Sequence, residues 1–424
     1  MYNLKVIRGD NMSTTQRQQA VFNKMADNEL MILYSGVQHH ISVDAYHPFA
    51  VNTQFYYLTG IERKDVIFVM HKGEDFDPVL FIKRIDPLEE KWMGKQLTVD
   101  QAKEISGIQN IKYLDEFDKF ITTLMMQQSV STVYFDLYRH TPTDLPDYNH
   151  VKAEEFKNRY SFVQLKNAYP LIAELRMQKD KEEIAKVQKA IDITKSGLEY
   201  VLQTLKPGMY ENQVQANFEY MIRYNGASGP SFNTIAGAGY NGTMLHYTEN
   251  NSPCNDNELI LLDLGAKYDG YCADITRTYP INGKYTARQK EIYDIVLLAN
   301  RTILKEAKPG MTTVDLNNIC KRVLADGLKR IGLIKEDSEL IKYYMHGVSH
   351  HLGIDVHDAT IASNRKLRPG AIISDEPGLY IEEENIGIRI EDDLLITEDG
   401  CVCLSQDIIR TTEEIEEYMA KNNK

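Results

Sequence analysis

A tetrapeptide that occurs twice limits the folds open to the second half of the chain. The sequence KPGM at 206–209 recurs at 308–311. Each copy follows an amphipathic helix pattern, over 193–205 and 292–307, and precedes another helix pattern. A Pro-Gly pair after a helix is ordinary stop chemistry, but two copies set between helices indicate a duplicated unit. A domain built in this way tends to hold its site between the halves, where both contribute side chains.

The first 170 residues show a different pattern, and the 424-residue length allows two domains. Apolar runs typical of strands alternate with helical stretches, which predicts an α/β domain. These runs begin at Met31, Val66, Val79 and Thr132. A junction is expected near Pro170, because proline disfavours helix in the residue before it. We therefore expect an α/β domain over 1–170 and a second domain over 171–424.

Charge and composition exclude several classes of protein. The chain carries 48 basic and 61 acidic residues, a net charge of −13, which disfavours binding to nucleic acid. No apolar run is long enough to span a membrane, and the first residues lack the apolar core of a signal peptide. The five cysteines form no CxxC pair and are expected as free thiols in a reducing compartment. A cytoplasmic location is therefore expected.

The first of three chemically suggestive clusters is a predicted hairpin. The strand pattern at 259–264 is followed by Asp269-Gly270, a strong tight-turn signal. Pairing about that turn sets Asp263 opposite Thr276, so that Asp263 and Asp274 lie diagonally on one face of the sheet. Two carboxylates on a partly buried face require a proton or a cation between them. A metal site and a solvated hairpin both remain open at this point.

The second cluster is HGVSHHLGIDVHD, over 346–358, which holds four of the eleven histidines. Such enrichment indicates chemistry, because imidazole can act as ligand, base or hydrogen-bond donor. A single-zinc site in which His346 and His350 bind from one helix is disfavoured, because glycines interrupt the segment and the glutamate of an HExxH motif is missing. For His351 alone, a packing or surface role is favoured.

The third cluster joins Glu376, in DEPGLYI, to Glu391, in IGIRIEDDLLI. The alternation at 386–391 predicts a strand, with Glu391 on the face opposite the isoleucines. A carboxylate inside so apolar a strand requires a cation or hydrogen bonds.

Taken together, the clusters supply four carboxylates and one imidazole, from Asp263, Asp274, His350, Glu376 and Glu391. An oxygen-rich set of this kind suits manganese, cobalt or iron better than a thiolate zinc site does. Its four negative charges match two divalent cations, which can activate a water and clamp an oxyanion. The charge balance therefore favours a hydrolase.

The order of these motifs resembles that of the pita-bread metallopeptidases, and most of all aminopeptidase P, the Xaa-Pro aminopeptidases. The similarity covers nearly the whole chain and includes NTQFYYLTGIE, EKWMGKQL, PSFNTIAGAGYNGTMLHYTEN and the tail TTEEIEEYM. It implies an N-terminal α/β domain for substrate gating and oligomerisation. It also implies a C-terminal α+β pita-bread catalytic domain with an internal pseudo-two-fold repeat.

The resemblance also implies a dinuclear metal centre with two divalent ions per chain. Manganese is expected first, with cobalt, zinc or iron as alternatives. By motif position, Asp263 would chelate one metal, Asp274 and Glu391 would bridge both, and His350 and Glu376 would bind the other.

Further roles follow from the same resemblance. Glu376 would carry a proton from the attacking water to the leaving proline nitrogen. His246 and His357 would hold the substrate and stabilise the oxyanion. His346 would line the proline pocket, and Arg389 would hold Asp263 in place.

Trp92 and several departures from the family pattern qualify this expectation. Relatives offer a tryptophan of this segment to a neighbouring subunit's site, which implies a homodimer or homotetramer; packing within its own domain is the alternative. Gln54 stands where close relatives carry an aspartate, and Phe232 stands where relatives often carry a tyrosine. The stretches 357–369 and 380–387 are shorter than in close relatives, so peptide-length preference does not carry over.

The expected activity is therefore that of a cytoplasmic Xaa-Pro aminopeptidase acting on peptides with proline at the second position. The nearest alternative is prolidase, which shares the metal centre but takes only dipeptides. Creatinase lacks the metal ligands, and methionine aminopeptidase lacks so long an N-terminal domain. A non-enzymatic, peptide-binding pita-bread protein is a more distant alternative.

Overall fold

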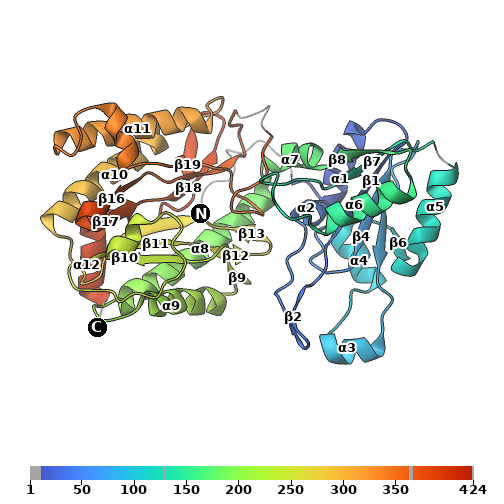
Figure 1. Ribbon diagram of the computed structural model, residues 1–424, viewed down its shortest axis with the longest axis horizontal. Helices are drawn as coiled ribbons and strands as arrows, with labels where there is room; N and C mark the ends of the chain where they lie inside the picture. Colours follow the sequence, from blue (N-terminus) through green and yellow to red (C-terminus); the bar gives the residue numbers. More distant parts are fainter. Residues whose placement is uncertain (1–10, 128, 362–365, 423–424) are drawn as a thin grey trace. The chain divides into compact units, whose positions relative to one another are not determined.

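The computed structural model describes residues 11–127, 129–361 and 366–422, which form two compact units (Figure 1). Among these residues, the N-terminal unit ends at Arg176 and the C-terminal unit begins at Met177. The junction expected at residue 170 differs because Pro170 lies in the first turn of a helix, where proline is tolerated. Residues 1–10, on which the signal-peptide expectation rested, lie outside the described residues.

A mixed six-stranded sheet forms the centre of the N-terminal unit, in the order β6-β5-β4-β1-β7-β8. All residues of β1 are buried, between an antiparallel β4 and a parallel β7. Burial of both faces explains why these strands appear in the sequence as continuous apolar runs, and the four predicted strands are confirmed. The elements are α1 (Thr14–Lys24), β1 (Glu29–Tyr34), β2 (His40–Ser42), β3 (Ala45–Tyr46), α2 (Thr53–Thr59), β4 (Ile67–His71), β5 (Val79–Ile82), α3 (Pro87–Met93), α4 (Val99–Ser106), β6 (Asn110–Tyr113), η2 (Leu114–Glu116), α5 (Phe117–Gln127), β7 (Thr132–Phe135), α6 (Tyr148–Arg159), β8 (Gln164–Asn167) and α7 (Tyr169–Arg176).

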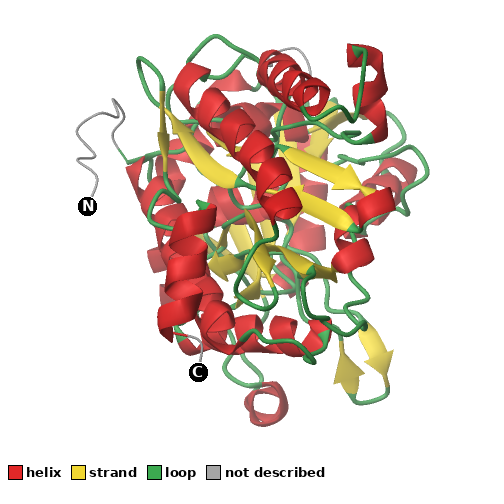
Figure 2. Cartoon of the chain, turned by 90° about the vertical axis from the view of Figure 1, so that its left-hand side faces the viewer, coloured by secondary structure: helices red, strands yellow, loops and turns green. Residues whose placement is uncertain are grey.

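The C-terminal unit contains two helix pairs and several short antiparallel sheets. α8 packs against α9, and α10 packs against α11. Figure 2 shows helices of this unit in front of its strands. Its elements are α8 (Lys181–Thr204), α9 (Glu211–Tyr224), β9 (Gly229–Pro230), β10 (Ile235–Ala238), η3 (Gly239–Thr243), β11 (Leu259–Leu264), β12 (Ala266–Tyr268), β13 (Tyr271–Cys272), β14 (Ile275–Pro280), α10 (Ala287–Glu306), α11 (Thr313–Arg330), η4 (Asp337–Lys342), β15 (Ile372–Asp375), β16 (Gly378–Ile381), η5 (Glu382–Glu384), β17 (Ile386–Arg389), β18 (Asp392–Ile396), β19 (Cys401–Cys403) and α12 (Thr412–Asn422).

The two KPGM segments make equivalent backbone hydrogen bonds, so the repeat is structural. The amide of Gly208 donates to the carbonyl of Cys254, whose own amide donates to Met209. In the second copy, Gly310 and Met311 form the same pair of bonds with Leu367. Each KPGM segment is thus hydrogen-bonded to a residue much further along the chain, Cys254 for the first copy and Leu367 for the second. Helix α9 begins just after the first segment, and helix α11 just after the second.

The predicted hairpin has the expected register. Asp263 pairs with Thr276, and Tyr268 pairs with Tyr271 around the two-residue turn. Asp269 and Gly270 both have positive φ, at 46° and 79°, as a type I′ turn requires. The turn residues therefore determine which face of the sheet the ligand candidates occupy.

None of the described helices combines the length and apolar character that a membrane span requires. The longest helix, α8, has 24 residues and buries one stripe of side chains, including Ile184, Val187 and Ile191. Its N-terminus carries the expected capping box, in which Asp180 and Glu183 each accept from the other's backbone amide. All five cysteines carry free thiols.

Candidate metal centre

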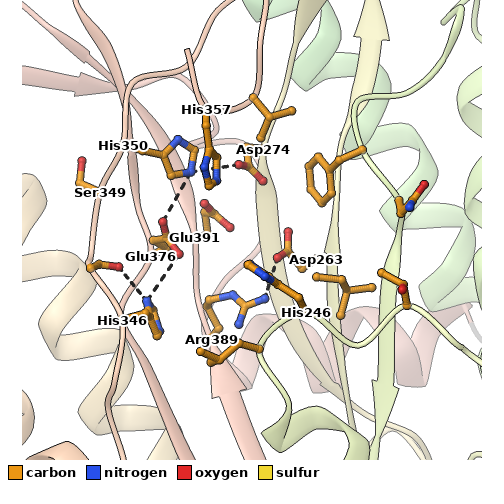
Figure 3. A pocket seen from close by; sticks show the side chains of 17 residues that line it. His246, Asp263, Asp274, His346, Ser349, His350, His357, Glu376, Arg389 and Glu391 are labelled. Carbon is orange, nitrogen blue, oxygen red and sulfur yellow. Dashed lines mark hydrogen bonds and ion pairs between the residues drawn. The ribbon is translucent and has the colours of Figure 1, made fainter. Parts of the chain in front are cut away.

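The five predicted metal ligands lie around one cavity of about 600 Å³ in the C-terminal unit (Figure 3). Asp263 lies on β11, and Asp274 immediately precedes β14. His350 lies in the loop before β15, Glu376 follows β15, and Glu391 lies between β17 and β18. Ligand atoms of Asp274, His350 and Glu391 all lie within 4.8 Å of one another. Both halves of the repeat contribute, as the duplication predicted.

Thr276 connects the ligands of the two halves. Its backbone carbonyl accepts from the amide of Glu391 at 3.0 Å, and its hydroxyl donates to the Glu391 carboxylate at 2.6 Å. Glu391 was expected inside the strand that begins at Ile386, but β17 ends at Arg389. The chain leaves β17 so that Glu391 can bond to β14, and hydrogen bonds therefore compensate part of its burial.

Arg389, which also lines the cavity, fixes Asp263. Its guanidinium donates to Asp263 Oδ2 at 2.6 Å, to Thr276 Oγ1 at 3.1 Å and to the Tyr380 hydroxyl at 2.8 Å. The second oxygen of Asp263, Oδ1, is buried without a hydrogen-bond partner. A buried carboxylate oxygen without a donor is the kind of atom that a cation would satisfy.

The carboxylates of the site repel one another. Burial, followed by the charges of neighbouring carboxylates, raises the pKa of Asp274 and of Glu391 well above their ordinary values. Burial also raises the pKa of Glu376. Such a group of acids is stable only when protonated or when cations lie between its members. The donor chemistry therefore fits divalent metal ions.

His350 is oriented by a neighbouring backbone group. Its Nδ1 donates to the carbonyl oxygen of His351 at 3.1 Å. Nε2 lies 3.4 Å from Asp274 Oδ2 and 3.5 Å from Glu376 Oε1. The second ring nitrogen thus faces two carboxylates, where it could act as a metal ligand.

Three further histidines line the same cavity: His246, His346 and His357. Burial, with a smaller effect from Arg389, lowers the pKa of His346 to about 4, so this ring is neutral at physiological pH. Its Nδ1 donates to the carbonyl of Gly347 at 2.7 Å, and its Nε2 lies 2.9 Å from the Tyr380 hydroxyl. The ring of His357 lies beside that of His350, with centroids 4.1 Å apart and ring planes tilted by 38°.

Trp92 is the predicted site residue that does not belong to the C-terminal unit. It lies on α3 of the N-terminal unit and is 82% exposed. Of the two noted replacements, Phe232 lines the cavity, and Gln54 is buried in α2. Part of the shortened stretch 357–369 lies outside the described residues.

Sequence reasoning missed the bonding roles of Thr276 and Tyr380. A signal was available for Thr276, because the predicted register already set it opposite Asp263. Tyr380 lies within the quoted motif DEPGLYI, but no spacing rule relates it to His346 or Arg389.

Two family models match the chain. Metallopeptidase family M24 matches residues 185–398, and the aminopeptidase P N-terminal domain matches residues 14–134. The matches fall in the two units that the structure separates, and the expected order of an α/β domain followed by a pita-bread domain is confirmed.

Individual proteins of known identity are similar over almost the whole chain. The Xaa-Pro aminopeptidase of Escherichia coli is 33% identical, and the match covers 96% of this chain and 98% of the relative. A solved structure of a candidate aminopeptidase P from Bacillus anthracis is 44% identical, with a TM-score of 0.94, over 97% and 98% of the two chains. Zinc-substituted Escherichia coli aminopeptidase P in complex with product is 32% identical, with a TM-score of 0.87, over 97% and 98%.

Proposed function

The chain belongs to metallopeptidase family M24, and we propose that its five convergent ligand residues hold two manganese ions. The protein is a metallo-exopeptidase that hydrolyses the bond between an N-terminal residue and a following proline. The observation that carries the metal proposal is the single cavity at which Asp263, Asp274, His350, Glu376 and Glu391 meet. Their oxygen-rich donor set favours manganese, with cobalt, zinc or iron as alternatives.

The five ligands divide between two ions in this proposal. Asp263 would hold one ion, His350 and Glu376 would hold the other, and Asp274 and Glu391 would contribute to both. When bound, such a pair supplies an activated water and polarises the scissile carbonyl. Arg389 keeps Asp263 oriented through its bond at 2.6 Å.

Glu376 is proposed to move the proton. Its carboxylate lies beside His350 and lines the cavity, and burial raises its pKa. A carboxylate with a raised pKa can accept a proton from water and pass it to the proline nitrogen as that nitrogen leaves. The hydroxyl of Ser374, 3.3 Å from Glu376 Oε1, holds the carboxylate in one orientation.

Substrate binding falls to the three other histidines. His246 and His357 donate to the scissile carbonyl oxygen and stabilise the charge that develops on it. His346 packs against the proline ring, and its neutral state suits this apolar contact. The cavity then orients a peptide whose second residue is proline.

The assembly and location are proposed as well. We infer a homodimer or homotetramer in which Trp92 reaches the cavity mouth of a neighbouring subunit. An exposed tryptophan beside exposed Leu88 and Met93 on α3 supports a covered surface. The free thiols support a reducing, cytoplasmic environment.

One experiment tests the activity and its metal dependence together. Chelator-treated protein is assayed on Gly-Pro and on longer Xaa-Pro-Yaa peptides, before and after manganese is added. We expect activity only with metal, and on the longer peptides. Activity that persists without metal would refute the metal centre, whereas cleavage of dipeptides alone would make the protein a prolidase.

A further inference from the structure

Glu211 is a completely buried carboxylate outside the metal centre, and it holds both ends of one loop. One oxygen accepts from the amide of Ala238 at 2.7 Å and from the side chain of Asn241 at 2.9 Å. The other accepts from the Tyr247 hydroxyl and from the amide of Ser252, each at 2.8 Å. The four donors span residues 238–252, so the carboxylate links the two ends of this segment, the 238–252 loop.

The internal repeat indicates that this carboxylate has a purpose other than starting a helix. Glu211 and Thr313 are each the second residue after a repeated KPGM, and each is the first residue of its helix. In the second copy, Thr312 and Asp315 cap α11 through a local capping box. Helix α11 therefore begins without a buried acid at that position, whereas the first copy uses Glu211 to bond to a distant loop.

The 238–252 loop carries His246, which directly precedes Tyr247, one of the four donors. Tyr247 is 8% exposed and packs in an apolar cluster with Ile235, Leu261 and Tyr380, while its hydroxyl reaches Glu211. His246 itself is exposed and lines the cavity. A rigid neighbour of this kind limits the directions in which the imidazole can point.

The opposite side of the loop is fixed by close packing of backbone. A Cβ on Gly387 would lie 1.8 Å from the carbonyl oxygen of Gly242, so η3 rests directly on β17. This contact sets the position of the loop on the sheet, and Glu211 and Asn250 are among the side chains that hold the segment 244–252. Asn250 bonds to Ala236 and Thr234 rather than to the Glu211 carboxylate.

We propose that Glu211 is a positioning residue for His246: its four hydrogen bonds hold the 238–252 loop so that the imidazole faces the bound peptide. The inference rests on the proposed substrate-binding role of His246. Glu211 acts through Tyr247 and the loop backbone and does not touch the substrate.

The test is a double-mutant cycle between E211Q and H246A, measured as kcat/KM on an Xaa-Pro-Yaa peptide. Glutamine has a similar shape, but its NH₂ group would face donors that now bond to a carboxylate oxygen. We expect E211Q to lower kcat/KM about tenfold or more, as small misplacements of binding groups do. In the H246A background the same change should cost roughly twofold at most, because the group it positions is already gone.

A second readout does not depend on metal or activity. In metal-free protein, E211Q should accelerate amide hydrogen exchange in residues 239–252 and leave 372–396 unchanged. The matched control is D315N, which removes an exposed carboxylate that bonds only within the cap of α11. D315N should leave both kcat/KM and exchange of the loop at wild-type values.

The outcomes separate the inference from the proposed function. If metal-loaded wild-type protein cleaves no Xaa-Pro peptide, the proposed function fails. If the wild type is active and E211Q retains its kcat/KM, or if the E211Q and H246A losses multiply, the positioning role is overturned. Should E211Q not fold, Y247F removes one of the four bonds while keeping the ring, and the same non-additivity with H246A is required of it.

Discussion

The two halves of the C-terminal unit share a scaffold but hold their functional loops in different ways. In the first half, the carboxylate of Glu211 accepts four hydrogen bonds from the loop that carries His246. In the second half, the loop that carries His350 and His357 is held by a buried ion pair between its own Asp358 and Lys179, which lies just before α8 in the first half. The backbone hydrogen bonds of the KPGM segments are equivalent in the two halves, whereas these side-chain interactions are not.

The difference teaches what a duplicated scaffold fixes and what it leaves open. The backbone hydrogen bonds of the KPGM segments determine where each loop returns to the sheet. The first half then presents Asp263 and Asp274 from a regular hairpin, and the second half presents histidines from irregular chain. We therefore expect substitutions to fail differently: through turn geometry in the hairpin of the first half, and through long-range side-chain pairs in the histidine loop of the second half.

The largest effect is expected for D274N, in the first half. The amide cannot supply the charge that balances two cations, so metal content should fall and kcat/KM should drop about a thousandfold or more. Elemental analysis and peptide kinetics measure both quantities. D269N, at the exposed turn of the same hairpin, is the control and should change neither. Full metal content and activity in D274N would remove this residue from the centre.

The next effect is expected for K179M, which removes the partner of Asp358 in the second half. Lys179 and Asp358 lie 2.8 Å apart, with both side chains 1% exposed. Removal of the cation leaves a buried charge, which should cost about 3–5 kcal/mol of unfolding free energy. Urea unfolding measures this loss. K186M, which breaks partly exposed pairs with Glu182 and Asp269, should cost under about 1 kcal/mol. Equal losses in K179M and K186M would contradict the distinction between buried and exposed pairs.

A pH dependence should distinguish the second half further. Burial, followed by the charge of Lys179, lowers the pKa of His351 to about 3. The unfolded chain binds this proton below about pH 6.5, so stability is complete above that pH and decreases as the pH falls towards 3. At pH 5 we expect the metal-free protein to lose about 2 kcal/mol through this residue. Urea unfolding at pH 7 and pH 5 should show a smaller decrease in H351N, and an unchanged decrease in the exposed control H47N.

The smallest effect is expected for G270A, in the hairpin turn. Gly270 has φ +79°, a conformation that alanine adopts only with strain, so about 1 kcal/mol of stability should be lost. G347A, in the irregular loop of the second half, meets no atom within 4 Å of the added Cβ and should be neutral in thermal unfolding. If G347A were the more damaging, the assignment of regular and irregular halves would be wrong.

Local signals in the sequence predicted the features that depend on local chemistry. The Asp269-Gly270 turn set the register of the hairpin, and the Asp180 capping box marked the start of α8. Local signals could not predict that Glu391 lies beyond the end of β17, nor that Glu211 accepts four hydrogen bonds from the 238–252 loop. Both depend on partners far along the chain, which no helical or strand period encodes. The shared order of motifs, rather than periodicity, associated the five ligands with one centre.

The claim that both halves together hold two ions is tested most directly by crystals of the protein grown with manganese and measured at its absorption edge. We expect two anomalous peaks about 3.5–4 Å apart, with the first-half aspartates and second-half His350 around them. A single peak contacted by one half alone, or side chains turned away from both peaks, would contradict the account.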